Sequence, residues 1–379
     1  MNTYKNVKDA AYGAAGNGST NDLPAINAAI ASTTDSRGVF FPAGTYRISG
    51  NLTIATGQSL VFDAGAKIQV DSGYTLTING SVVGDLGQKF SGPGATVFGF
   101  GSQVLDIPIT WFGAIAGVSA DQTPAILSAI KSANTGNGQR IRVPCGEYAL
   151  YTTLVLPSTQ GRVKLIGEGF SKSTFVFTPP TSGDACISIT ATLDRIEFEG
   201  LGLSAVAVAG KRSVGVVFAA GSFGYDTITE VKFKDVNFHN FNKYGVDVKC
   251  TGIYTRFEDC RFDGIQNTTA NGGDGADYAY AIYNIDKVLA VCQIAGTRFS
   301  TCDGVWKGAA YLLELSSGSA IERCGCTTKA ATGTRTTPGH IIDISGGFFT
   351  IDNVWTEINY ADGSSWLILE GHGGRSDFQ

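Results

Sequence analysis

The chain is poor in the residues that metal, nucleic-acid and membrane proteins rely on. Its 379 residues include 3 His and one Met, and no apolar run approaches the roughly 18 residues of a membrane-spanning helix. The net charge of −5 excludes the basic surface typical of nucleic-acid binding. With so few His, the Cys-Gly-Cys sequence at residues 324–326 is too little for a zinc site. We therefore expect no metal, no cofactor, no nucleic acid and no membrane.

The chain also begins without a secretory signal, and its cysteines form no paired pattern. Residues 1–5 (MNTYK) lack an apolar core, which predicts that the chain is not exported by the usual secretory route. Its 8 Cys are spread through the sequence, several at positions that face inward in predicted strands. We interpret them as free, buried thiols, which pack like small hydrophobic residues, rather than as disulfides or metal ligands.

The abundant residues favour β-structure. The chain has 50 Gly, about twice the average share, and it is rich in Val, Ile, Phe, Tyr and Thr but sparse in helix formers. The glycines have no three-residue period, and a hydrophobic content of 43% argues against disorder. The composition predicts an all-β protein with many tight turns.

A six-residue pattern recurs through the second half of the chain. Its first, fourth and sixth positions are apolar, except at Thr297 and Thr356, and the positions between them are mostly polar or small. Successive copies start 24 to 37 residues apart, which indicates a solenoid built of strands. The copies are residues 198–203 (FEGLGL), 233–238 (FKDVNF), 257–262 (FEDCRF), 294–299 (IAGTRF), 321–326 (IERCGC) and 351–356 (IDNVWT).

Three segments near the start of the chain recur 100 to 102 residues later. The pairs are residues 12–14 and 112–114, 24–30 and 124–130, and 42–46 and 144–148. In each copy a Pro precedes an Ala- and Ile-rich stripe, which predicts a short amphipathic helix that caps the open end of a solenoid. We expect a small β-module at residues 1–105 and a main solenoid at residues 106–379. The small module should contain strands at residues 52–54, 59–62, 67–70 and 75–78.

The two module starts resemble a known family. Residues 12–22 (YGAAGNGSTND), the helix after them and residues 41–46 (FPAGTY) resemble the opening of the pectate-lyase-like right-handed parallel β-helices, although Asn17 replaces the usual Asp. The second start, residues 109–114 (ITWFGA), resembles the junction before the main β-helix of bacteriophage tailspikes and capsule depolymerases. The resemblance implies a right-handed parallel β-helix. It also implies a homotrimer of the virion tail, made in the host bacterial cytoplasm, that binds and usually cleaves a bacterial surface polysaccharide.

The second strand of several coils carries a candidate row of acids. Three such strands read apolar, acidic, apolar, and a fourth has Asn at the central position. Because stacked strands lie about 4.8 Å apart and alternate residues face outward, we expect one outward file. Its members are Asp247, Asn284, Glu314 and Asp343. Carboxylates about 5 to 9.5 Å apart suit two-carboxylate glycoside hydrolysis, although outward acids are also common on solvated faces.

The first strand of each coil predicts a second outward file, between positions four and six of the repeat. Its members are Gly202, Asn237, Arg261, Arg298, Gly325 and Trp355. Arg261 and Arg298 suit bidentate binding of an acidic sugar, or they pair with nearby acids. Trp355 and Trp306 are candidate stacking platforms for sugars, or they pack in a turn or a subunit interface.

Two other segments contribute candidates. Residues 353–357 (NVWTE) resemble a segment that often ends in Trp-Phe-Glu in phage depolymerases, which makes Glu357 a further candidate acid. The longest loop follows Asp263, and its Asp274 and Asp277 could close over a bound saccharide. Residues 272–277 also resemble one unit of a calcium-binding repeat, but such sites need tandem units.

Three functions remain open. Hydrolysis would use Glu314, Asp343 or Asp247 as acid and as base or nucleophile, and it leads the three. A polysaccharide lyase would instead need a base beside a uronate, and its candidates are Arg261, Arg298, Tyr283 and His340. The third is a receptor-binding or structural tail protein without catalysis, because fold alone does not determine function. The end of the chain has no capping module, so we expect it to stop within a longer protein.

Overall fold

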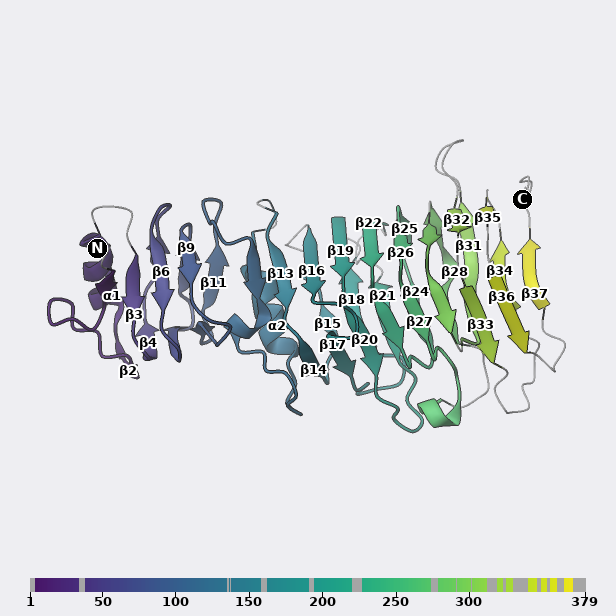
Figure 1. The fold of residues 1–379 in the computed structure, drawn as a ribbon, viewed down its shortest axis with the longest axis horizontal. Helices are drawn as coiled ribbons and strands as arrows, with labels where there is room; N and C mark the ends of the chain where they lie inside the picture. Colours follow the sequence, from purple (N-terminus) through teal and green to yellow (C-terminus); the bar gives the residue numbers. More distant parts are fainter. Residues whose placement is uncertain are drawn as a thin grey trace. The chain divides into compact units, whose positions relative to one another are not determined.

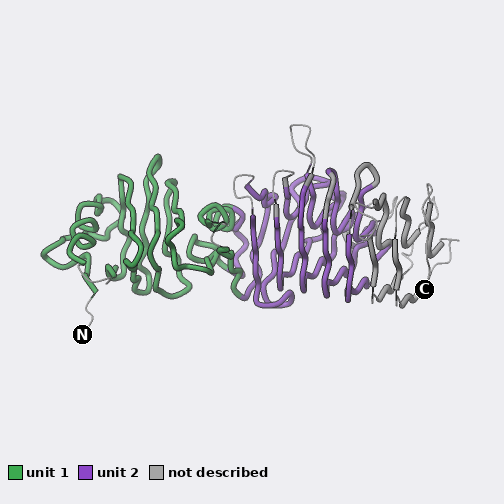
Figure 2. Tube along the Cα trace, turned by 90° about the horizontal axis from the view of Figure 1, so that it is seen from above, with its two compact units in different colours: residues 1–115, 124–144 green, residues 116–123, 145–379 purple. Residues whose placement is uncertain are grey.

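The computed structural model divides the chain into two compact units (Figure 2). Unit 1 comprises residues 1–115 and 124–144, and unit 2 comprises residues 116–123 and 145–379. The domain boundary that the sequence predicts at residue 105 stays a prediction. Beyond residue 303 only the backbone is described. The described residues are 4–33, 38–134, 136, 138–157, 162–190, 194–219, 227–273, 279–290, 292–300, 302–311, 319–322, 325–329, 340–345, 349–352, 355–359 and 365–370.

Unit 1 is built of short parallel strands (Figure 1). Three sheets have the orders β1-β3-β6-β9, β10-β7-β4-β2 and β11-β8-β5, and β12 pairs with β13. The predicted helices are present as α1 (Leu23–Ala31) and α2 (Thr123–Ser132). All four predicted strands are confirmed, because their alternating apolar residues are buried. The strands are β1 (Lys5–Asn6), β2 (Asn17–Asn21), β3 (Val39–Phe41), β4 (Gly44–Ile48), β5 (Leu52–Ile54), β6 (Ser59–Phe62), β7 (Ala66–Val70), β8 (Thr75–Ile78), β9 (Ser81–Val83), β10 (Phe90–Ser91), β11 (Ala95–Phe98), β12 (Asp106–Pro108) and β13 (Arg140–Val143).

Buried polar contacts hold the motif at the start of the chain. The carboxylate of Asp22 is 2% exposed and accepts the backbone N–H groups of Ala15 and Gly16 at 2.6 and 3.1 Å. Tyr46 is fully buried, and its hydroxyl donates to the carbonyl oxygen of Pro42 at 2.7 Å. Burial raises the pKa of Tyr46, and the charge of Asp22 adds to that rise. These contacts explain why the motif needs an acid and a tyrosine at those positions.

Unit 2 is a parallel β-helix in which each turn of the chain adds a strand to three stacked faces (Figure 1). The predicted all-β parallel β-helix is therefore confirmed. Face 1 contains β16 (Val163–Gly167), β19 (Asp194–Glu199), β22 (Thr227–Lys234), β26 (Arg256–Glu258), β29 (Gln293–Ala295), β32 (Ser319–Glu322) and β35 (Phe349–Asp352). Face 2 contains β14 (Gly146–Leu150), β17 (Ser173–Phe177), β20 (Gly202–Ala205), β23 (Asn237–His239), β27 (Arg261–Asp263), β30 (Arg298–Ser300), β33 (Gly325–Lys329) and β36 (Trp355–Asn359). Face 3 contains β15 (Leu154–Val155), β18 (Ala185–Thr190), β21 (Val214–Ala219), β24 (Tyr244–Val248), β28 (Tyr280–Ala290), β31 (Gly304–Tyr311), β34 (His340–Ser345) and β37 (Ser365–Glu370). The short β25 (Thr251–Ile253) pairs with the start of β22 and the end of β28.

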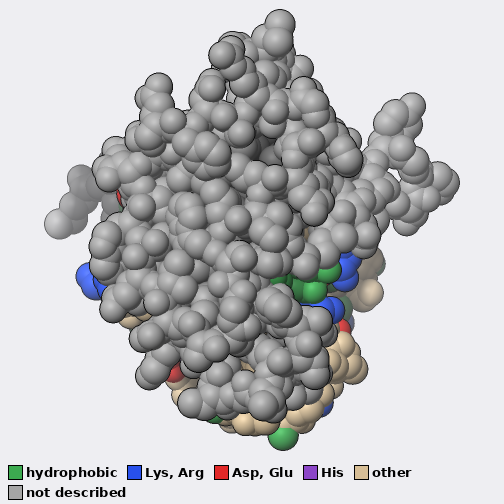
Figure 3. Space-filling view, turned by 90° about the vertical axis from the view of Figure 1, so that its right-hand side faces the viewer, with side chains coloured by type: hydrophobic (Ala, Val, Ile, Leu, Met, Phe, Trp, Pro, Cys, Tyr) green, Lys and Arg blue, Asp and Glu red, His purple; other side chains and the backbone are tan. Residues whose placement is uncertain are grey.

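The six-residue repeat of the sequence is the register of faces 1 and 2. The first positions of all six copies pair from strand to strand along face 1, and the sixth positions pair along face 2. The rings of Phe198, Phe233 and Phe257 stack at 5.1 and 5.0 Å between centroids. Charged side chains of described residues lie at the rim of the view in Figure 3. The apolar positions therefore form the core, and the positions between them face outward.

Left-handed backbone makes the corners between faces. At the corner between faces 3 and 1, Arg195, Glu230 and Tyr254 have φ angles of 57°, 53° and 56°. Few residues other than Gly adopt this conformation. Because it occurs at the same position of three successive coils, we infer that the stacking of the coils imposes the bend. At the corner between faces 1 and 2 the equivalent residues include Asp235 and Asp259, with φ angles of 51° and 53°.

Most of the described cysteines fulfil the prediction of free, buried thiols. Five are free and buried, whereas Cys145 is free and exposed. The buried five are Cys186, Cys250, Cys260, Cys292 and Cys302. In the described residues no helix is long and apolar enough to cross a membrane.

Candidate active site on face 3

The outward file of face 3 differs by one residue from the predicted file. Asp247 of β24 pairs with Tyr283 of β28, Tyr283 pairs with Lys307 of β31, and Lys307 pairs with Asp343 of β34. Asn284 lies one position further along and its side chain is fully buried. The prediction that Asn284 belongs to the outward file is wrong, because a shift of one residue turns a side chain to the other face of a strand.

The described strands do not bring two of the predicted acids together. Glu314 lies outside the described residues, and β31 ends before it at Tyr311, so Lys307 holds the register position next to Asp343. Asp247 and Asp343 are three strand steps apart, which is about 14 Å at the backbone. Two-carboxylate hydrolysis needs a separation of roughly 5 to 9.5 Å, so these two acids cannot act as a pair.

Asp247 is a buried acid rather than an open one. Its side chain occupies an outward register position but is only 6% exposed. Its Oδ2 atom lies 3.5 Å from the Nζ atom of Lys249, whose side chain is 55% exposed. The carboxylate therefore holds a cation at the surface and is itself poorly placed to contact a substrate.

A pair of tyrosines lies beside Asp247. The rings of Tyr244 and Tyr283 stack at 4.0 Å between centroids, and Tyr280 lies 6.2 Å from Tyr283. The pKa of Tyr244 is raised, first by burial and then by a side-chain hydrogen bond with Tyr283. Electrostatic interactions with Tyr283 and Asp247 add to the rise, and Arg212 opposes it. Tyr244 therefore keeps its proton at ordinary pH.

Lys243 is the titratable cation of this cluster. Its Nζ atom lies 5.4 Å from the centroid of the Tyr244 ring. Burial lowers the pKa of Lys243, Asp247 opposes that shift, and the positive charges of Lys249 and Arg212 lower the pKa further. A lysine whose pKa is lowered in this way is neutral for more of the time, and a neutral amine is a base.

Contacts between coils position the cations. Asn242 is 1% exposed, and its side-chain oxygen accepts the backbone N–H of Ser213 at 2.6 Å while its amide donates to the carbonyl of Lys211 at 3.0 Å. These bonds hold the backbone on both sides of Arg212 next to Lys243. The face 3 cluster is defined as Arg212, Lys243, Tyr244, Asp247, Lys249 and Tyr283.

The outward file predicted on face 2 has the expected register. Gly202, Asn237, Arg261, Arg298, Gly325 and Trp355 occupy successive paired positions. The guanidinium of Arg261 lies 4.3 Å from the centroid of the Phe170 ring, rather than against Glu258. Arg261 thus packs on an aromatic ring, and Arg298 stays a predicted sugar ligand.

The remaining predicted residues are distributed over other positions. Trp306 shares a register position with Ile282, whose side chain is fully buried, and Glu357 shares a face 2 column with His239 and Asp263. His340 begins β34. Asp274 and Asp277 lie outside the described residues. No group of three or more His, Cys, Asp or Glu in the described part of the chain could hold a metal ion.

Sequence reasoning missed Arg212, Lys243, Tyr244 and Lys249. One signal could have located Tyr244 and corrected the register. Residues 244–247 (YGVD) and residues 280–283 (YAIY) share the order aromatic, small, aliphatic, and their register is the one observed. The cations carry no such signal, because they come from separate loops.

The chain is similar to proteins of one broad structural type. Residues 4–89 match the family described as Rhamnogalacturonase A/epimerase, pectate lyase-like. No curated protein matches the chain. A solved structure of ORF18 of Geobacillus virus E2 is 15% identical over 72% of this chain and 59% of its own, with a TM-score of 0.37.

Two further solved structures are similar. The enzymatically active domain of tailspike protein 2 of bacteriophage CBA120 is 15% identical, over 72% of this chain and 47% of its own, with a TM-score of 0.37. The family 28 exopolygalacturonase of Yersinia enterocolitica is 12% identical, over 99% of this chain and 77% of its own, with a TM-score of 0.34. The chain spans about half the length of the two phage proteins. The chain is thus a parallel β-helix protein whose opening residues match the pectate-lyase-like rhamnogalacturonase A/epimerase family.

Proposed function

We propose that unit 2 binds and cleaves an acidic bacterial surface polysaccharide at the face 3 cluster, as part of a bacteriophage tail protein. The observation that carries this proposal is the gathering of Arg212, Lys243 and Lys249 around two stacked tyrosines. Cations bind the carboxylate of a uronate, and aromatic rings pack against the apolar face of a sugar. The family match of residues 4–89 and the phage-like second module start support the polysaccharide and the tail.

The cluster favours β-elimination as the reaction. Neutral Lys243 takes the proton from C5 of a uronate, while Arg212 or Lys249 binds its carboxylate. The electrons of the C5–H bond form a double bond between C4 and C5, and the C4–O bond breaks. The leaving oxygen keeps that electron pair and takes a proton from water. The lowered pKa of Lys243 suits the base, because a base works best with a pKa near the working pH.

Hydrolysis is the second candidate, and one observation favours it. Asp235 and Asp259 occupy equivalent positions at the corner between faces 1 and 2, on adjacent coils about 4.8 Å apart at the backbone. Burial raises the pKa of Asp235, Arg261 opposes that rise, and Asp259 and Glu199 add to it. Two neighbouring carboxylates, one of them with a raised pKa, are the arrangement that glycoside hydrolysis uses.

Product analysis distinguishes the two reactions and tests the function. We would incubate the protein with a panel of bacterial capsular and O-antigen polysaccharides and analyse the products by mass spectrometry. β-Elimination gives unsaturated products that absorb in the ultraviolet, whereas hydrolysis gives reducing ends without that absorbance. Lys243→Met should abolish the first activity and Asp235→Asn the second. Binding of a polysaccharide without either product would contradict the proposed enzymatic activity and would support a receptor-binding tail protein.

The homotrimer and its attachment to the phage tail are further parts of the proposal. They follow from the resemblance of the module starts to phage tailspikes. Native mass spectrometry of the purified protein measures the first directly. A mass of three chains supports the proposal, and a stable monomer at micromolar concentration opposes it.

A further inference from the structure

The corner between faces 3 and 1 holds a cavity of about 430 Å³. Its polar lining comes from three successive coils, and the cavity is larger than the lower end of the range of about 300 to 1,000 Å³ for small-molecule sites. The polar and aromatic residues that line the cavity are Arg195, Glu197, Glu230, Lys232, Tyr254 and Arg256. None of them belongs to the face 3 cluster.

Three residues with left-handed backbone line the cavity. Arg195, Glu230 and Tyr254 are the three corner residues with positive φ; Arg195 lies in β19, Glu230 in β22, and Tyr254 just before β26. The Tyr254 ring is left 38% exposed beside Arg195 and Arg256, which is high for a large aromatic residue.

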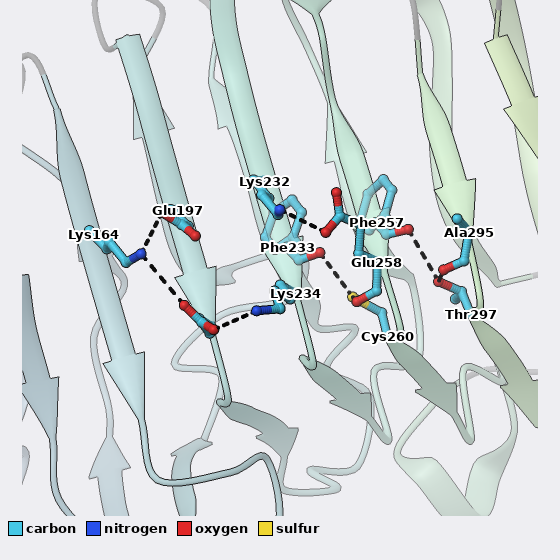
Figure 4. Close-up of polar contacts among 11 residues, drawn as sticks. Lys164, Glu197, Lys232, Phe233, Lys234, Phe257, Glu258, Cys260, Ala295 and Thr297 are labelled. Atoms are coloured by element: carbon cyan, nitrogen blue, oxygen red, sulfur yellow. Dashed lines mark hydrogen bonds and ion pairs between the residues drawn. The ribbon is translucent and has the colours of Figure 1, made fainter.

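Ion pairs neutralise most of the charge in the cavity. Arg195 pairs with Glu230 at 2.7 Å. Figure 4 shows two more pairs: Glu197 with Lys164 at 2.8 Å, and Lys232 with Glu258 at 2.7 Å. Arg256 is exposed and forms no ion pair with any residue that the structure describes. The charge that remains available in the cavity is therefore positive.

We propose that this cavity binds one carboxylated sugar residue of an acidic polysaccharide, as a second carbohydrate site separate from the face 3 cluster. The guanidinium of Arg256 would bind the carboxylate through two parallel hydrogen bonds, and the Tyr254 ring would pack against the sugar. The choice of a polysaccharide rests on the proposed function. A second site on the same chain would raise the local concentration of substrate at the first site.

A fluorine label on tyrosine can report on both sites separately. We would incorporate 3-fluorotyrosine into the full chain and assign the resonances of Tyr254, Tyr244 and Tyr283 with single Tyr→Phe variants. The probe is methyl glucuronide, which has a carboxylate but no substituent on O4 and so cannot undergo the elimination. Methyl glucoside and acetate serve as the neutral sugar and the free carboxylate.

The proposal predicts a saturable shift of the Tyr254 resonance with methyl glucuronide. Methyl glucoside and acetate should shift it at least tenfold less effectively. Arg256→Gln should weaken the glucuronide effect at Tyr254 by about tenfold, because it removes a hydrogen-bonding charge. The matched control Arg162→Gln, at an exposed arginine outside the cavity, should leave it unchanged.

Three results would overturn the second site: an unmoved Tyr254 resonance, an equal response to methyl glucoside, or an unchanged response in Arg256→Gln. Failure of the face 3 cluster would be seen separately, as unmoved resonances of Tyr244 and Tyr283. The two proposals can therefore fail independently.

Discussion

The rings of Tyr244 and Tyr283 stack at 4.0 Å between neighbouring strands of face 3. A side-chain hydrogen bond joins the two residues, and the ammonium of Lys243 lies over the Tyr244 ring. This aromatic surface partly shields Lys243 from water while Asp247 holds Lys249 nearby. In the proposed reaction, this stack would support the sugar and Lys243 beside it would act as the base.

Removing the amine of Lys243 should abolish cleavage. Lys243→Met keeps most of the side-chain volume but cannot accept a proton. Because general bases contribute about 10²- to 10⁴-fold, we expect the rate of ultraviolet-absorbing product to fall at least about 100-fold. Lys172→Met, at an exposed lysine elsewhere on unit 2, is the control and should retain full activity. An active Lys243→Met protein with normal circular dichroism would exclude Lys243 as the base.

The pH dependence of the rate should identify the reaction. The pKa of Lys243 lies below the 10.5 of a free lysine, so elimination should speed up as pH rises through the lowered pKa and then level off below pH 10.5. Hydrolysis through protonated Asp235 should instead slow as pH rises through the raised pKa of that acid. Initial rates measured across this range decide between the two profiles.

Stability should follow the same lysine. Between its lowered pKa and 10.5, the folded protein binds fewer protons at Lys243 than the unfolded chain does, so the free energy of unfolding rises with pH. The loss of stability caused by protonated Lys243 is present in full below the lowered pKa, and it disappears as pH approaches 10.5. Urea denaturation of wild type and Lys243→Met should show a difference that shifts in favour of the wild type over this window. A constant difference would mean that Lys243 titrates normally.

Loss of the Asp303 carboxylate should destabilise unit 2. This side chain is 2% exposed, and its Oδ2 atom accepts the backbone N–H groups of Asn267 and Ala279 at 2.9 and 3.1 Å. Hydrogen bonds to charged groups contribute about 1.5 to 3 kcal/mol each, so Asp303→Ala should lower the free energy of unfolding by about 3 kcal/mol or more. Asp303→Asn keeps an acceptor and should cost less. Urea denaturation measures the free energy of unfolding of both variants. Equal losses of stability would show that the negative charge of Asp303, rather than a hydrogen-bond acceptor alone, is needed.

Opening a cavity in the ring stack should cost more than reshaping it. Phe257 is fully buried, with its ring 5.0 Å from that of Phe233. Phe257→Ala should lower the free energy of unfolding by about 3 to 5 kcal/mol. Phe257→Leu keeps more of the volume and should cost clearly less, which guanidinium denaturation can measure. A small effect of the alanine variant would show that the neighbouring coils collapse into the space.

Face 2 and the core could be predicted from the sequence because the repeat contains its own register. Each six-residue copy spans the corner between faces 1 and 2 without an insertion, so Phe233 aligns with Phe257 and Arg261 aligns with Arg298 by counting alone. At the described corners, the left-handed residues Gly200, Asp235, Asp259 and Gly296 keep the count constant.

Face 3 could not be aligned in this way. The strands β24 and β28 follow loops of different length, and the pattern apolar, polar, apolar fits two alignments that differ by one residue. A slip of one residue exchanges the two faces of a strand, which is why Tyr283 rather than Asn284 lies beside Asp247.

The sequence by itself determined the all-β class, the capping helices and the inward residues, because apolar periodicity and glycine turns act locally. Only the tertiary structure decided which polar residues meet. Arg212, Lys243 and Tyr283 lie on successive coils and are brought together by the pairing of β21, β24 and β28. That pairing also buries Asp247 and lowers the pKa of Lys243, and both effects depend on neighbours that lie far away along the chain.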